Sequence, residues 1–343
     1  MSTKFQINDP SLESQWRSLI LFGKNSATYK FAFAKSLITL IGNQTTSISL
    51  SDLAVPFAGN IIEHLKFNDK QGSSQSSKFL NSCRAFIKNE LNQDQLYRDT
   101  EKFGFVNVID AFQNVNGGAI PNPFYEKNFA VGKKEIIITD SLLKLFDTFQ
   151  FKNLDQEVEA RWNLVETAWS LNISPNILEV KYDDVESLLF VQNNFMRRVN
   201  ITSVRDALNG YQKGKCFYSF QDISIYKNDE LNMCAIDHFL PHLHKQYHHN
   251  EGANINGVWN LVLSDKQINN NKSARIPEKR FLERLFNRNE FYIESKHPLA
   301  ETIINQTGYT RAQRIAFLEK QYNLASELAI QKWQPKIELA GSF

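Results

Sequence analysis

The chain has 343 residues, of which 42% are apolar and 22% are charged, a composition typical of folded domains and not of disordered chains. Its formal net charge is only +2, which excludes the overall basicity of a nucleic-acid coat or packaging protein. The length predicts two ordinary domains, and the charge confines any nucleic-acid contact to a local patch.

The first residues lack the apolar core of a secretory signal, and no apolar run approaches the roughly 18–20 residues that span a bilayer. The three cysteines, Cys83, Cys216 and Cys234, are too few and too scattered for a disulfide framework. We therefore expect a cytoplasmic protein without a membrane partner.

Residues 1–205 are predicted to form a mostly helical domain, because apolar residues recur there at helical spacing. The predicted helices lie within residues 12–42 (two helices), 50–65, 78–91, 140–146, 153–171 and 185–196, with a short strand at 135–139. The clearest pattern is a single apolar stripe: Leu154, Val158, Trp162, Val165 and Trp169. Glu157, Glu159 and Arg161 are expected on the solvent side of that helix. No residue pattern in this domain indicates a known chemistry.

From residue 206 onward the pattern changes to strands. Segments 215–220 and 231–237 flank a turn-forming tract at 227–229, which predicts a β-hairpin. Six of the seven histidines lie between His238 and His297. That concentration is informative because histidine is the side chain best suited to proton transfer near neutral pH.

Three short motifs follow one another in this region. They are Cys234-Ala-Ile-Asp-His-Phe-Leu-Pro241, Asn260-Leu-Val-Leu263 and Asn269-Asn-Asn-Lys-Ser273. The order Asp-His, Asn, Asn-x-x-Lys resembles the HNH endonuclease family, whose ββα-metal fold cleaves phosphodiester bonds. The resemblance covers residues 210–277. Together with the helical patterns on either side, it predicts an α+β protein in three parts: the helical domain (1–205), an HNH nuclease domain (206–300) and a C-terminal helical tail (301–343) packed on the helical domain.

The resemblance also implies a role for each motif residue. His238 would be the general base, and Asp237 and Asn269 would bind one Mg²⁺ or Mn²⁺, since hard oxygen ligands suit these cations. Lys272 would contact the phosphate as the second catalytic residue. Asn260 would tie down the loop that carries the histidine, which is a structural role.

Local patterns fit these positions. Ser264 and Gln267 have the spacing of a capping box, which predicts a short helix with Asn269 and Lys272 on one face. Neighbouring residues on a regular strand point to opposite faces, so we expect the strand to break at His238, next to Asp237.

Two features differ from the family pattern or leave alternatives open. Many HNH proteins carry two Cys-x-x-Cys pairs for a structural zinc, but Ser219 and Ile268 stand at two of those positions, so structural zinc is not expected. Cys234 with the nearby histidines is the alternative zinc set, and solvated loop histidines are favoured over it. Further on, Arg275, Lys279 and Arg280 belong to a basic run that either follows a nucleic-acid backbone or forms an ordinary helix surface.

The sequence thus predicts a metal-dependent HNH endonuclease that cleaves DNA and leaves 5′-phosphate ends. The alternatives are a non-catalytic nucleic-acid-binding or assembly subunit that keeps the fold, and a nuclease that cleaves RNA. HNH proteins with additional domains also resemble components of bacterial restriction and anti-phage defence systems, which implies a protein partner.

Overall fold

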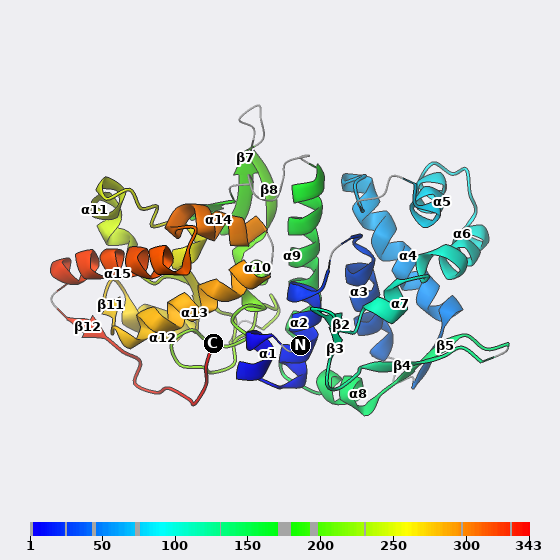
Figure 1. Ribbon diagram of the computed structural model, residues 1–343, viewed down its shortest axis with the longest axis horizontal. Helices are drawn as coiled ribbons and strands as arrows, with labels where there is room; N and C mark the ends of the chain where they lie inside the picture. Colours follow the sequence, from blue (N-terminus) through cyan, green and yellow to red (C-terminus); the bar gives the residue numbers. More distant parts are fainter. Residues whose placement is uncertain are drawn as a thin grey trace. The chain divides into compact units, whose positions relative to one another are not determined.

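The structure is a computed structural model that describes residues 3–24, 26–42, 46–72, 76–130, 132–170, 180–192, 198–229, 231–295, 298–329 and 331–343. The secondary structure is mixed α+β, as the sequence predicts, and the chain divides into two compact units, Met1–Asn172 and Ile173–Phe343 (Figure 1). Within the described ranges, no helix has both the length and the apolarity to cross a membrane.

The first unit is built around α9 (Phe151–Ser170), which packs against α2 (Leu12–Phe22) and α3 (Tyr29–Ile41). α3 in turn packs against α4 (Leu50–Phe67). The other helices of this unit are α1 (Lys4–Asn8), α5 (Lys78–Ile87), α6 (Gln93–Asp99), the π-helix η1 (Thr100–Gly104), α7 (Val108–Ala111) and α8 (Asp140–Phe146).

Two small antiparallel sheets complete the first unit. One has the strand order β1 (Ser47–Ser49), β5 (Glu135–Ile138), β4 (Tyr125–Asn128), and the other pairs β2 (Asn114–Val115) with β3 (Gly118–Ala119). The strand predicted at 135–139 is therefore present as β5.

The predicted apolar stripe of α9 lies in the core, where Leu154, Val158 and Trp162 are fully buried. The expectation for two of its charged residues is wrong, because Glu157 and Arg161 are also buried. Glu157 accepts two hydrogen bonds from the Arg17 guanidinium, at 2.7 and 2.8 Å. α9 has neighbours on more than one side, so its polar flank is enclosed and its charges are paired instead of solvated.

The second unit begins with an antiparallel sheet of β6 (Lys181–Asp183), β7 (Leu188–Gln192) and β8 (Arg198–Ser203), followed by α10 (Val204–Asn209). Its remaining strands are β9 (Ala235–His238), β10 (Leu261–Ser264), β11 (Ile276–Pro277) and β12 (Lys332–Trp333). Its remaining helices are η3 (His242–His244), α11 (Lys245–Asn250), η4 (Val258–Asn260), α12 (Lys266–Lys272), α13 (Arg280–Glu294), α14 (Pro298–Thr307) and α15 (Arg311–Leu328).

Two predictions about this region need correction. The division between the units falls after Asn172 and not at residue 205, because the sheet β6–β7–β8 belongs to the second unit, where β8 packs on α10. The helix expected at 185–196 is the strand β7, and residues 193–197 lie outside the described part of the chain. Its buried side chains, Leu189 and Val191, are two apart, which is the period of a strand.

The predicted hairpin is also wrong in its pairing. β9 pairs with β10, whereas residues 217–219 form a turn. Phe220 donates its N–H to the carbonyl of Cys216, and its φ of 57° is incompatible with an extended strand.

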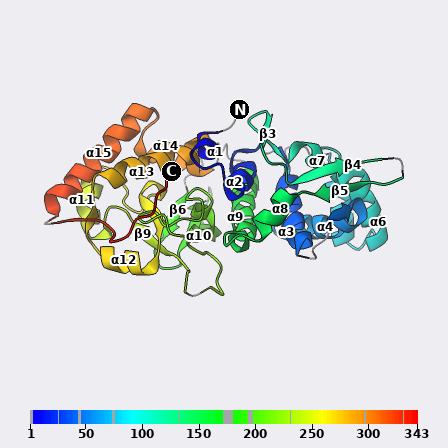
Figure 2. The same cartoon turned by 90° about the horizontal axis from the view of Figure 1, so that it is seen from below.

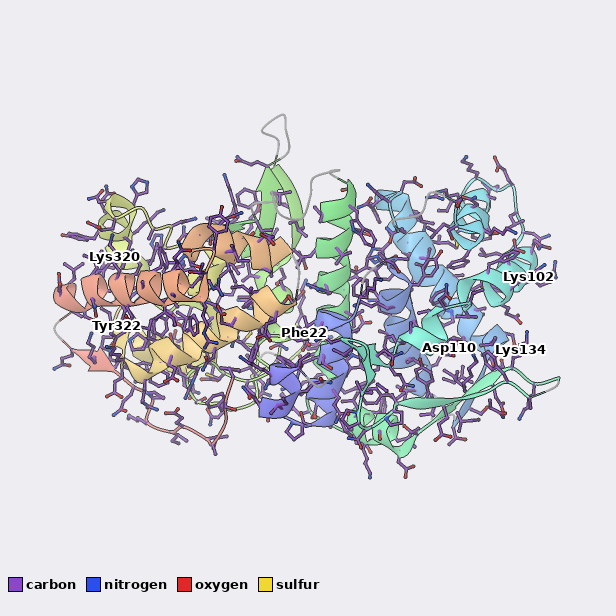
Figure 3. All side chains as sticks on the ribbon, viewed as in Figure 1. Phe22, Lys102, Asp110, Lys134, Lys320 and Tyr322 are labelled. Atoms are coloured by element: carbon purple, nitrogen blue, oxygen red, sulfur yellow. The ribbon has the colours of Figure 1, made fainter. Side chains whose placement is uncertain are left out.

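The C-terminal helices pack within the second unit. α15 contacts α13 and α14, and the Tyr322 hydroxyl donates a 2.7 Å hydrogen bond to the carbonyl of Pro277 (Figure 3). Lys320 of the same helix pairs with Glu251 at 2.9 Å. The C-terminal helices therefore pack on their own unit, whereas the sequence analysis expected them to pack on the helical domain.

The last residues form a strap across the segment that carries Tyr218. β12 runs parallel to β11, and the ring of Trp333 meets the ring of Tyr218 edge to face at 5.0 Å. Leu339 donates its N–H to the carbonyl of Ser219 at 2.8 Å, and the ring of Phe343 stacks on Phe217 at 6.0 Å. The strap thereby holds the segment 217–219 against the rest of the unit.

Candidate active site

The three sequence motifs meet in an antiparallel strand pair followed by a helix. In the pairing of β9 with β10, His238 lies opposite Leu261 and Asp237 opposite Val262. α12 follows β10 directly and packs on β9 (Figure 2). The helix begins as predicted, but its cap is Asp265 and not Ser264, since the Asp265 carboxylate accepts the N–H groups of the first turn.

Asp237 and His238 make their contacts in different directions, as neighbouring residues on a strand do. β9 ends at His238, where the sequence predicts the strand to break. Asp237 contacts Tyr218 and Lys272, whereas the ring of His238 contacts Asn256.

The Asp237 carboxylate is held by two buried side chains. The Tyr218 hydroxyl donates a 2.6 Å hydrogen bond to Oδ2, and the Lys272 ammonium lies 3.1 Å from both carboxylate oxygens. Burial raises the pKa of Tyr218, and the Asp237 charge raises it further, so the hydroxyl keeps its proton and donates. Lys272 also donates to the carbonyl of His238 at 2.8 Å, which links α12 to the end of β9.

Lys272 is not in the position that a phosphate contact needs. Its side chain is 0% exposed and is directed at Asp237, inside the unit. The observed contacts make it the counter-charge and anchor of a buried carboxylate, a role that the motif alone does not distinguish from phosphate binding.

His238 is mostly enclosed, with 15% of its side chain exposed. Its Nε2 lies 3.0 Å from the amide oxygen of Asn256 and 3.7 Å from a carboxylate oxygen of Asp184. Among the described residues, Nδ1 has no hydrogen-bond partner. Burial lowers the pKa of His238, and the Asp184 charge and the Asn256 hydrogen bond oppose that shift only in part. The ring is therefore neutral near pH 7.

Asn260 is fully buried and binds the backbone on both sides of the loop that follows His238. Its amide oxygen accepts from Leu240 N–H at 2.9 Å, and its amide nitrogen donates to the carbonyls of Leu240 and Ile255 at 3.0 and 2.9 Å. These are the contacts that the expected structural role requires.

A pocket of about 420 Å³ opens beside β9 and α12. Its lining includes Asp237 and His238 from the strand, Asn269 from the helix and His242 from the loop between the strands. The structure therefore brings the predicted base and both predicted metal ligands to one cavity. Lys272 and Asn260 are not among its lining residues; they hold Asp237 and the loop after His238 in place.

A divalent cation fits the chemistry of this lining. The Asp237 carboxylate and the Asn269 amide supply hard oxygen donors, and Mg²⁺ typically takes only one or two protein oxygens and completes its shell with water or phosphate oxygens. No group of three or more His, Cys, Asp or Glu side chains in the described ranges is arranged to hold a metal ion. A cation here would thus depend on the amide and on solvent or substrate, and Lys272 would compete with it for Asp237.

The cysteines of this region take part in packing. Cys216 and Cys234 are free and fully buried, and the Cys216 sulfur accepts the N–H of Asp265 at the start of α12. Of the nearby histidines, His248 is buried and its Nδ1 lies 2.7 Å from the amide oxygen of Gln321.

The basic run after the motif is largely engaged within the protein. Arg275 donates to the carbonyl of Asn271, and Arg280 pairs with Glu278 and with Glu338. Lys279 precedes α13 at its N-terminus. These contacts favour the helix-surface interpretation for Arg275 and Arg280.

Three residues of the site escape the sequence motifs: Tyr218, Asn256 and Asp184. Tyr218 lies in a segment predicted as a strand, and Asn256 lies in the loop between the motif elements. Asp184 lies in the turn between β6 and β7, directly before the segment 185–196 that was predicted to be helical. Of the three, only Asn256 lies near a motif residue in sequence, four residues before Asn260.

No protein-family model matches the chain, and no curated protein or solved structure is significantly similar to it. The motif residues and the geometry of this pocket are therefore the features that bear on function.

Proposed function

We propose that the protein is a metal-dependent endonuclease of the HNH type that hydrolyses phosphodiester bonds in DNA. The observation that carries the proposal is the convergence of Asp237, His238 and Asn269 on one pocket. Asp237 and His238 come from β9 and Asn269 from α12, and the paired strands β9 and β10 followed by α12 have the ββα order that the motif resemblance implies.

In this proposal, His238 acts as the general base through Nδ1, which is free of protein partners among the described residues. The lowered pKa keeps the ring neutral and ready to accept a proton from water. Asp237 and Asn269 would hold one Mg²⁺ or Mn²⁺, which supplies charge stabilisation for the scissile phosphate and the departing 3′ oxygen. Cleavage leaves a 5′-phosphate.

Lys272 and Tyr218 serve the site by fixing Asp237. Each donates to the carboxylate, so its orientation is determined before substrate arrives. The same contacts keep a buried anion satisfied when no cation is present.

Nicking of supercoiled plasmid DNA with Mg²⁺ or Mn²⁺, and its loss on chelation, tests the activity. We expect His238→Ala to reduce the rate by about 10²–10⁴-fold, the usual contribution of a positioned base. His249→Ala is the matched control, since His249 is exposed on α11 and has no part in the pocket. Equal rates for the wild type and His238→Ala would contradict the proposal.

One observation favours a second candidate, a nucleic-acid-binding or assembly subunit without turnover. The Lys272 ammonium already balances the Asp237 charge, as it would in a site that no longer takes a cation. Salt-sensitive DNA binding without cleavage under Mg²⁺, Mn²⁺ and Ca²⁺ would favour this candidate. The same assay with single-stranded and duplex RNA tests whether RNA is the substrate.

A further inference from the structure

We infer that Asn256 and Asp184, which lie outside the motif, are positioning residues that fix His238 in the tautomer with its hydrogen on Nε2. The lone pair of the neutral ring is then on Nδ1. The use of Nδ1 in catalysis rests on the proposed function, whereas the tautomer is a property of the folded protein alone.

The inference begins at the carboxylate of Asp184. An ionised carboxylate only accepts hydrogen bonds, and Asp184 Oδ2 lies 3.2 Å from the amide nitrogen of Asn256. The NH₂ end of that amide must therefore face Asp184. The amide oxygen then faces His238, at 3.0 Å from Nε2.

The second step follows from the amide oxygen. A carbonyl oxygen has no hydrogen to give, so the contact with His238 forms only when Nε2 carries the hydrogen. In a neutral ring, this places the lone pair on Nδ1. The Asp184 carboxylate, which cannot donate, thus sets the donor and acceptor roles of both hydrogen bonds between Asp184 and His238.

Both positioning residues are themselves held in place. The backbone of Asn256 is held in place within its loop, because its N–H donates a hydrogen bond to Asn254 Oδ1 at 3.1 Å. The turn that carries Asp184 is fixed by Asp183, whose Oδ1 accepts the N–H groups of Val185 and Glu186 at 2.9 and 3.0 Å.

Asp184 acts through Asn256 more than through direct charge. Its distance of 3.7 Å from Nε2 exceeds a hydrogen bond, and its side chain is 39% exposed, so the direct ion pair is screened. Its other oxygen lies 3.6 Å from His242, a half-exposed ring that also lines the pocket. The carboxylate therefore connects two histidines of the same cavity.

The tautomer is measured directly by ¹H–¹⁵N correlation spectra of the full chain labelled with ¹⁵N-histidine, at about pH 8, where an ordinary histidine is neutral. His238→Gln assigns the signals. We expect the wild type to give the Nε2–H pattern. Asp184→Asn, which frees the Asn256 amide to invert, and Asn256→Ala should both give a mixture of tautomers.

The kinetic arm uses the same variants. Both should lower kcat for plasmid nicking by about 10- to 10²-fold, the cost of a misplaced group, and leave KM within about twofold. Asp222→Asn is the matched control, because Asp222 is a surface carboxylate of the same unit that pairs with Lys215. Thermal unfolding shows that each variant is folded.

The outcomes separate the two ideas. An Nδ1–H or mixed pattern in the wild type, or a pattern unchanged in both variants, overturns the inference whatever the activity. An Nε2–H pattern that is present in the wild type and lost in both variants supports the inference. If the wild type shows this pattern but cleaves no DNA, the proposed function alone is overturned.

Discussion

Two enclosed histidines, one in each unit, have opposite electrostatic surroundings. His64 on α4 lies between two carboxylates: its Nδ1 is 2.9 Å from Glu166 and its Nε2 is 3.3 Å from Glu159. Its ring also stacks on Trp162, with 3.5 Å between the ring centres. His238 on β9 has a neutral amide as its nearest partner and a carboxylate only at 3.7 Å.

The pKa of each ring follows from these partners. Burial opposes the charge on His64, but the hydrogen bonds to Glu159 and Glu166 outweigh it and raise the pKa to about 9. At His238 burial prevails and the pKa is lowered. Near neutral pH, His64 is therefore a cation that belongs to the fold, and His238 is a neutral ring that retains a lone pair.

A histidine is thus made structural or reactive by where its nearest carboxylate lies. Direct contact with two carboxylates commits both ring nitrogens of His64 as donors. An amide placed between His238 and Asp184 commits only one nitrogen.

Lys272→Met should have the largest effect on stability, about 4 kcal/mol, because it leaves the Asp237 carboxylate buried without its cation. Urea unfolding measures the loss. Lys266→Met, on the exposed side of the same helix, is the control and should stay within about 0.5 kcal/mol of the wild type. Adding Asp237→Asn should recover part of the loss, and a double variant less stable than the single one would refute the pairing argument.

Alkaline pH should weaken the first unit by about 3 kcal/mol through His64. The folded pKa of about 9 lies above the unfolded value of about 6.5. The contribution is therefore complete below about pH 6.5 and is lost as pH rises through 9. Unfolding free energies between pH 6 and 10 measure it, and His64→Gln should flatten the curve.

Glu166→Gln should cost about 2 kcal/mol near neutral pH, because it replaces a charged acceptor of two hydrogen bonds, from His64 and from Gln71. It should also move the alkaline loss of stability to lower pH, since the pKa of His64 falls towards its ordinary value. A curve superimposable on that of the wild type would show that Glu159 alone holds the charge.

Asp184→Asn, the corresponding change beside His238, should alter stability by less than about 1 kcal/mol, because the carboxylate is partly exposed. Its effect should appear in the tautomer and in kcat instead. A loss as large as that of Glu166→Gln would remove the distinction between the two histidines.

Much of the candidate site was predictable because its motif residues are close in sequence. The end of the strand at the Asp-His pair and the short helix that carries Asn269 follow from local spacing, and the loop-binding role of Asn260 is what the family resemblance implies. The role of Lys272 was not predictable in the same way, because an ammonium serves a phosphate or a buried carboxylate equally well.

The features that could not be predicted depend on contacts between residues that are far apart in the sequence. No pattern in the sequence near Asp184 indicates that it contacts Asn256. The apolar residues of β7 also fit a helix until the pairing of β7 with β6 and β8 is known. The burial of Glu157 has the same cause, since its charge is paired with Arg17 from another helix. Helix caps were predictable to one residue, because Ser264 and Asp265 offer the same capping chemistry.

The strap at the end of the described chain has a practical consequence. Trp333 and the residues up to Phe343 rest on the segment that presents Tyr218, and Tyr218 orients Asp237. Removal of the residues that follow α15 would therefore disturb the candidate site from positions that look remote from it.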